Sequence, residues 1–209
     1  MNLLLEVSRL LRHGVVPEGG FIAASTRDSA KDTAAEKTRG RRATDNDEAS
    51  HRAAATAPWA EWLRPQEIVL DVDVRDRNGA LHMAAAYIGR AHVLDPGAIF
   101  RALMRREQVG STALGQGVAI PHARIPGLAR PLTLFMRTRY AIAFDAPDDK
   151  PVSNILAIMV PADGATDDYL QLLAMVASAF SDRAFRASLS AATTAAQVDE
   201  VFAGWRRPA

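Results

Sequence analysis

The residues best suited to chemistry gather in one stretch of this chain, which reads RREQVGSTALGQGVAIPHA over positions 105–123. It ends around His122, and histidine is the side chain that is neutral and nucleophilic near pH 7 without special help. Pro121 fixes the backbone torsion just before it, and the apolar run 118–120 predicts a short strand that anchors this backbone in a sheet. A histidine displayed at a strand end beside glycines and arginines is typical of a phosphoryl acceptor.

Further residues of the stretch are suited to holding a phosphate. The planar guanidinium of Arg106 gives two-point contact, and one pair of unit charges about 4 Å apart is worth roughly 4 kcal/mol at an effective dielectric of 20. Gly115 and Gly117 allow close backbone approach, while Ser111 and Thr112 supply hydroxyl donors. The same pattern also fits a plain turn that carries a hydrogen-bonded core histidine, and the spacing alone leaves both interpretations open.

The remaining histidines favour plainer interpretations. His82 falls inside a predicted helix as a packed or surface side chain, and His92 falls in a loop, where it suits local hydrogen bonding. His13 and His51 lie near the N-terminus, far along the chain from the glycine-rich stretch. No HExxH motif or carboxylate–histidine cluster is present, so the sequence indicates neither a metal nor a cofactor.

The elements that must position this stretch alternate between helices and strands from residue 59 onward, which predicts an α/β sandwich with one central sheet. Caps mark several helix starts: Asp95 precedes Pro96, Thr166 precedes two aspartates, and Thr194 with Gln197 forms a capping box. The expected helices cover residues 78–90, 96–107, a stretch after Thr166, 182–190 and a stretch after Thr194, and the expected strands cover 132–139, 141–144 and 153–160.

Composition excludes several classes of function. The chain has 209 residues, with 25 Lys and Arg against 24 Asp and Glu, so a net charge of +1 creates no field suited to nucleic acid or an anionic membrane. The absence of cysteine excludes disulfides, thiolate nucleophiles and cysteine zinc sites. No apolar run approaches the roughly 20 residues that span a bilayer, and charges at Glu6, Arg9 and Arg12 argue against a signal peptide. We therefore expect a cytoplasmic protein.

The amino-acid composition changes twice along the chain and thereby divides it into three segments. Residues 1–22 are a short amphipathic segment, either a loosely docked terminal helix, which we favour, or a helix for a membrane surface or partner. Residues 23–58 contain no large apolar side chain, which predicts a disordered linker. Its arginines at 39–42 suit a solvated tether better than a nucleic-acid contact, because acids follow at once. Residues 59–209 form the folded domain.

Several motifs together resemble one known family. The run GSTALGQGVAIPHA looks like the active-site signature of the fructose/mannitol-type (type 2) enzyme IIA domain of the bacterial phosphotransferase system. The run AIAFDAPDDKPV at 141–152 and the segment VPAD at 160–163 are similar to the same domain in order and spacing. The similarity covers about Leu63–Phe202, and within the family it is greatest to the nitrogen-regulatory enzyme IIA.

The resemblance implies a single central mixed β-sheet flanked by helices on both faces, as in the type 2 enzyme IIA sandwich. It also implies that His122 is the phosphorylated nucleophile, that Arg106 supports the phosphoryl group, and that no cofactor takes part. The residues that match the adjoining loop are Ser111, Thr112, Gly115 and Gly117. The implied donor is a phosphohistidine carrier protein of the HPr type, itself charged by enzyme I from phosphoenolpyruvate.

One departure concerns a second histidine that many family members carry near the start of the helix after the VPAD segment. The corresponding stretch here is TDDYLQ at 166–171, where Tyr169 or Gln171 offers a hydrogen bond to the His122 site instead. This departure puts efficient transfer in doubt more than acceptance.

Three functions remain open, in this order. The first is a phosphocarrier, rather than a turnover enzyme, that regulates target proteins in nitrogen or potassium control. It is favoured because the chain carries neither a permease segment nor a cysteine-bearing IIB domain. The second is the IIA component of a sugar importer that passes phosphate to a separate IIB protein. The third is an IIA-like binding module that takes no phosphate.

Overall fold

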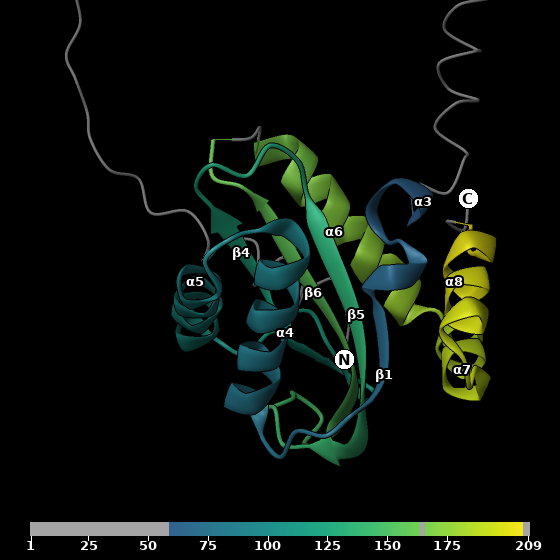
Figure 1. Cartoon of the computed structure of the whole chain (residues 1–209). Coiled ribbons are helices and arrows are strands. Elements are labelled where there is room, and N and C mark those ends of the chain that lie inside the picture. Colours follow the sequence, from purple (N-terminus) through teal and green to yellow (C-terminus); the bar gives the residue numbers. More distant parts are fainter. Residues whose placement is uncertain (1–58, 164–165, 207–209) are drawn as a thin grey trace, which may run out of the picture. The chain divides into compact units, whose positions relative to one another are not determined.

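A mixed sheet of six strands carries helices on both faces in the computed structural model, which describes residues 59–163 and 166–206 (Figure 1). This confirms the predicted fold class. The predicted N-terminal segment 1–22 and linker 23–58 lie outside the described residues.

The helical elements are α3 (Trp59–Trp62), the 3-10 turn η1 (Pro65–Glu67), α4 (Arg77–His92), α5 (Pro96–Val109), α6 (Thr166–Ser181), α7 (Arg183–Ala191) and α8 (Ala195–Gly204). The strands are β1 (Ile68–Val72), β2 (Ala113–Gly115), β3 (Val118–Ala119), β4 (His122–Ile125), β5 (Leu132–Ile142) and β6 (Val152–Pro161). Within the described part of the chain, no helix has both the length and the apolar character needed to cross a membrane.

The sheet places its strands in the order β1-β5-β6-β3-β2, and β4 also pairs with β6. Strands β5 and β6 are antiparallel, whereas β1 runs parallel to β5, and both β3 and β4 run parallel to β6. Val118 faces Asn154 and His122 faces Ile158, so β3 and β4 keep one register and form a single line interrupted near Pro121. No other described strand pairs with β4, which leaves His122 on an edge strand.

The alternation of side chains along the central strand β6 divides the core into two layers. Ile155, Ala157 and Met159 pack on the face covered by α4 and α5, and Leu156 and Ile158 pack on the face covered by α3, α6, α7 and α8 (Figure 1). Because both faces of β6 are covered, its sequence is a nearly continuous apolar run.

The side chains of β3 and β4, which lie end to end along β6, alternate between the same two layers. Val118 and Ile120 belong to the layer under α6, and Ala119 and Ala123 belong to the layer under α4 and α5. His122 therefore faces α6, while α5 lies beside its strand at the sheet edge (Figure 1).

Capping chemistry accounts for the helix starts that the sequence predicts correctly. The Asp95 carboxylate accepts the Gly97 N–H at 2.8 Å ahead of α5, and Thr194 and Gln197 form the predicted reciprocal box ahead of α8. Helix α6 begins at Thr166 itself, and the side chains of its first three residues are outside the described part.

One strand prediction was wrong in detail. The segments 132–139 and 141–144, predicted as two strands, are joined as β5, which ends at Ile142. The register explains the difference: between Arg137 and Ile142 the strand advances five residues while β6 advances two, so the extra residues bulge out of the ladder.

Candidate functional site

The ring of His122 is held by a hydrogen bond at each nitrogen. Its Nδ1 lies 2.8 Å from the carbonyl oxygen of Ile120, and its Nε2 lies 2.9 Å from Nε of Arg106. A carbonyl can only accept, so the ring proton belongs on Nδ1; the guanidinium can only donate, so Nε2 carries the lone pair. The two bonds therefore select one tautomer, in which Nε2 is the nucleophilic nitrogen.

Burial keeps this ring neutral. His122 is 4% exposed, and burial, followed by the nearby Arg106 cation, lowers its pKa from 6.5 to about 3. The bond to Ile120 acts in the opposite direction with less effect. The lone pair on Nε2 is consequently present across the physiological pH range.

Arg106 lies in the last turn of α5, and its guanidinium contacts both His122 and the Gly110 carbonyl after the helix. Its Nη1 donates to the Gly110 carbonyl at 2.9 Å, which fixes the plane of the group. Its Nη2 is buried without a partner among the described residues. A buried cationic N–H group without an acceptor, next to a nucleophilic nitrogen, is placed to receive an anionic oxygen.

Tyr169 and Arg124 complete the surroundings of the ring. The rings of Tyr169 and His122 lie 5.9 Å apart, and the Arg124 guanidinium lies 5.1 Å from the Tyr169 ring centroid. Burial raises the pKa of Tyr169 to about 12 against the opposing effect of Arg106 and Arg124, so its hydroxyl stays protonated and can donate. Because Tyr169 is in the first turn of α6, the positive end of that helix also faces the site.

Two predicted phosphate ligands have structural partners instead. The buried Glu107 carboxylate accepts from the Thr112 backbone N–H at 3.1 Å and from the Thr112 hydroxyl at 2.6 Å. Burial raises the pKa of Glu107, while Thr112 and, at 3.7 Å, Arg77 act in the other direction. The Ser111 hydroxyl donates to the Phe144 carbonyl at 2.6 Å. Both hydroxyls thus fasten the segment after α5, because each donates to an acceptor within the protein.

The two predicted loop glycines lie away from His122. Gly115 and Gly117 have φ values of +82° and +78° and turn the β2–β3 hairpin. Val118, next to this turn, faces Asn154, four residues along β6 from the partner of His122, which is about 13 Å of strand. Their positive φ serves the turn, and a role for these glycines in holding a phosphate stays a prediction.

The remaining candidate residues differ in whether their side chains point toward His122. Tyr169 contacts the His122 ring, whereas Gln171 is exposed, because residues two apart on a helix do not share a face. Arg124 was missed by sequence reasoning, although its spacing of two from His122 on a strand places both on one face. His92 lies 3.3 Å from Glu67, and His82 packs edge-to-face on Phe100.

The tautomer predicts a pH-insensitive ring. In ¹⁵N NMR spectra of histidine-labelled protein, we expect His122 to show a protonated Nδ1 and an unprotonated Nε2 from about pH 8 to pH 5, a range in which an ordinary histidine becomes charged. Arg106→Gln should raise the pKa of His122 toward its usual value by removing the neighbouring cation. A midpoint between pH 6 and 7 in the parent protein would contradict the assignment.

The hydrogen bonds between Thr112 and Glu107 at the end of α5 predict an effect on the free energy of unfolding. Glu107→Ala leaves the Thr112 N–H and hydroxyl buried without their acceptor, so urea unfolding should show a loss of about 1–3 kcal/mol. The exposed neighbour on the same helix gives the control, because Gln108→Ala should stay within about 0.5 kcal/mol of the parent. Equal effects of the two substitutions would show that the Glu107 carboxylate does not stabilise the fold.

Comparison with known proteins gives a consistent result. The model of the family described as "Phosphoenolpyruvate-dependent sugar phosphotransferase system, EIIA 2" matches residues 61–204. A nitrogen regulatory protein of Bradyrhizobium diazoefficiens is 32% identical over 146 residues, which are 70% of this chain and 95% of that protein. A fructose-specific EIIA component from Haloferax volcanii is 32% identical over 143 residues, which are 68% of this chain and 92% of that protein.

Solved structures agree with this match. The nitrogen regulatory protein IIA-Ntr from Neisseria meningitidis superimposes with a TM-score of 0.65 at 39% identity, covering 68% of this chain and 97% of its own. Mannitol IIA from Escherichia coli shares the fold, with a TM-score of 0.57 at 18% identity over 67% of this chain and 98% of its own. The family match spans the sheet, its helices and His122, and on these grounds the chain belongs to the EIIA type 2 family of the phosphoenolpyruvate-dependent sugar phosphotransferase system.

Proposed function

We propose that this protein is a cytoplasmic phosphocarrier that accepts a phosphoryl group on Nε2 of His122 from a phosphohistidine carrier of the HPr type. The observation that carries the proposal is the pair of bonds on the ring, from Nδ1 to the Ile120 carbonyl and from Arg106 to Nε2. Together they leave a neutral imidazole whose lone pair meets a cation. This arrangement suits a nucleophile that must attack a highly anionic group.

The transfer needs no additional base. The Nε2 lone pair attacks phosphorus, and an Nε2–P bond forms as the N–P bond of the donor breaks. The electron pair of the broken bond stays on the donor nitrogen. The proton on Nδ1 of His122 remains in its bond to Ile120, so the phosphorylated ring gains a formal positive charge, while the donor ring, which keeps its own N–H, leaves as a neutral imidazole.

Arg106 changes partner during this step. Its Nε must release Nε2 as the bond to phosphorus forms, and the guanidinium then donates to the phosphoryl oxygens, with the unpartnered Nη2 as the first N–H available. A phosphoryl group brings a charge of about −1.5 to −2, which this cation, the Tyr169 hydroxyl and the start of α6 together stabilise. Arg124 adds a second cation behind the Tyr169 ring.

We further propose that the phosphorylation state regulates target proteins. The similarity to nitrogen regulatory proteins over nearly their whole length supports this role. Phosphorylation would place phosphoryl oxygens with almost two negative charges on a ring at the sheet edge, which is enough to switch a protein contact. A second candidate is a IIA component that passes the group to a separate IIB protein in sugar import, supported by the similarity to a fructose-specific EIIA component.

The proposal predicts where the phosphoryl group is accepted. After the full chain is mixed with phosphoenolpyruvate, enzyme I and an HPr-type carrier, intact-protein mass should show one acid-labile phosphoryl group, which His122→Asn abolishes. Arg106→Gln should slow acceptance at least about tenfold, corresponding to the loss of a charge-assisted hydrogen bond of roughly 1.5–3 kcal/mol.

The control for the loss of charge is Arg101→Gln on the same helix, where an exposed ion pair is worth little, and its rate should match the parent. If the folded parent takes no phosphoryl group from a charged carrier, the protein is a binding module and the phosphocarrier proposal fails.

Tyr169 gives a finer prediction about the site. Tyr169→Phe keeps the ring that packs on His122 but removes the hydroxyl donor, so acceptance should fall about two- to tenfold, the worth of one hydrogen bond of roughly 0.5–1.5 kcal/mol. The measurement is the rate of single-turnover phosphoryl transfer to each protein. The melting temperature checks that the variant is folded. An unchanged rate would mean that Tyr169 only packs against the histidine.

A further inference from the structure

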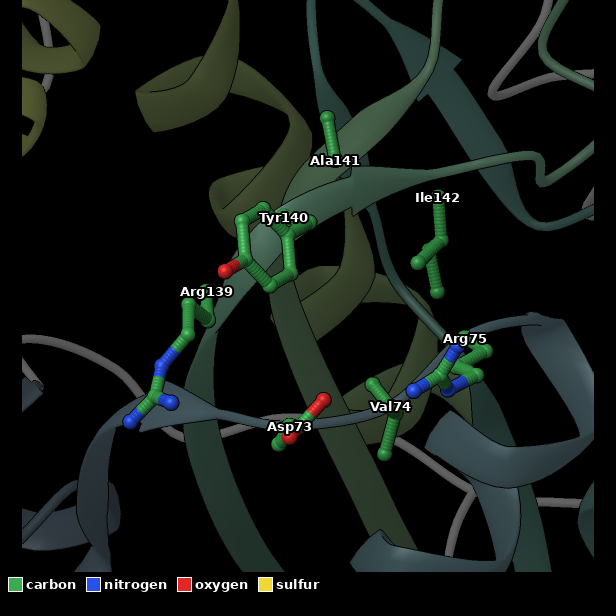
Figure 2. Close-up of a pocket in the computed structure, with 7 residues that line it drawn as sticks. All are labelled: Asp73, Val74, Arg75, Arg139, Tyr140, Ala141 and Ile142. Atoms are coloured by element: carbon green, nitrogen blue, oxygen red, sulfur yellow. The ribbon is translucent and has the colours of Figure 1, made fainter.

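A hollow of about 400 Å³ lies between the segment after β1 and the last residues of β5 (Figure 2). Its lining consists of Asp73, Val74, Arg75, Arg139, Tyr140, Ala141 and Ile142. Ile142 faces Val152 on β6, whereas His122 faces Ile158, so the hollow lies six residues, or about 20 Å, along the sheet from the histidine. It is therefore separate from the proposed phosphoryl site.

The backbone along one side of this hollow has no strand partner. The ladder with β1 ends at Thr138, and the ladder with β6 skips from Arg137 to Ile142. The three residues 139–141 consequently face no strand in either ladder, and all three are exposed. Residues 139–141 bulge out of the sheet beside the hollow, so their side chains are accessible to a partner.

The arginines around the hollow lack the partners that their neighbours have. Arg77 pairs with Asp145 at 2.5 Å, and Arg137 donates to the Ala192 carbonyl at 2.6 Å. By contrast, the exposed guanidiniums of Arg75 and Arg139 make no ion pair or hydrogen bond with any residue in the described ranges. These two cations are available to an external anion.

Two further side chains indicate which kind of ligand the hollow can bind. Tyr140 is 68% exposed, and tyrosine and arginine are the residue types that dominate protein-binding hot spots. In the view of Figure 2 the Asp73 carboxylate lies between Arg139 and Arg75. This carboxylate can accept an N–H group from a bound peptide, which a polyphosphate does not offer. The polar, exposed rim also differs from the enclosed apolar pockets typical of small-molecule sites.

We propose that this hollow binds an extended acidic segment of a partner protein. The segment's carboxylates contact Arg75 and Arg139, and Tyr140 packs across it. Because the hollow is about 20 Å along the sheet from His122, such a partner can stay bound while a phosphoryl donor reaches the histidine.

The test uses the ¹⁵N-labelled full chain and a capped eight-residue peptide that alternates glutamate and threonine. In NMR titrations we expect saturable shifts of the amides at 73–75 and 139–142, with a Kd of about 1 mM or tighter at low salt. The double variant Arg75→Gln, Arg139→Gln should weaken binding at least about fivefold, since two charge-assisted contacts are lost. The exposed arginine on α4 supplies the matched control: Arg90→Gln should bind like the parent.

Several results would overturn the proposal. These are the absence of saturable shifts, shifts centred elsewhere, equal binding of the same peptide with glutamine in place of glutamate, or tighter binding of inorganic tripolyphosphate at the same residues, which would mark a small-anion site. The double variant should still accept a phosphoryl group at the parent rate. Failure of peptide binding is thereby distinguishable from failure of the phosphocarrier proposal, because the two readouts use different residues.

Discussion

The carbonyl of Ile120 accepts the Nδ1–H of His122 at 2.8 Å, and this bond decides which ring nitrogen can react. It exists because strands β3 and β4, which both pair with β6 in the same register, are separated by a break near Pro121. Pro121 has no N–H to donate, while its own carbonyl accepts the Ile158 N–H at 2.8 Å. The histidine is thus positioned by pairing with the central strand β6, and not by a loop.

Burial gives the site both its reactivity and its main constraint. A ring that is 4% exposed stays neutral, but its Nε2 is also occupied by Arg106, which must move before phosphorus can approach. The guanidinium is held on its other side by Gly110, and the adjacent Glu107 ties the end of α5 to Thr112. Arg106 can therefore exchange partners while the helix that carries it stays fixed.

Sequence reasoning succeeded where a residue type has one physical use. The helix starts at Asp95 and Thr194 follow from capping, and the strand β6 follows from its apolar run. His122 and Arg106 were chosen for chemistry that few other side chains supply; the structure brings them within 2.9 Å, and their roles in phosphoryl transfer stay a prediction.

It left the outcome to the fold where one residue type has several uses. The hydroxyl of Thr112 suits a phosphate as well as a buried carboxylate, and only the fold shows that Glu107 receives it. Gly117 suits an anion as well as a turn, and its φ of +78° shows the turn. Strand β1 was missed because its five residues are too few, and too mixed in polarity, to show a period. The bulge in β5 depends on its pairing with β6, which no local pattern reveals.

The most direct measurement is the ¹⁵N–³¹P coupling in the phosphorylated full chain, prepared with ¹⁵N-labelled histidine. The account predicts that phosphorus couples to Nε2 of His122 while the proton stays on Nδ1, as the bond to Ile120 requires. Phosphorus on Nδ1, or on any residue other than His122, would contradict it.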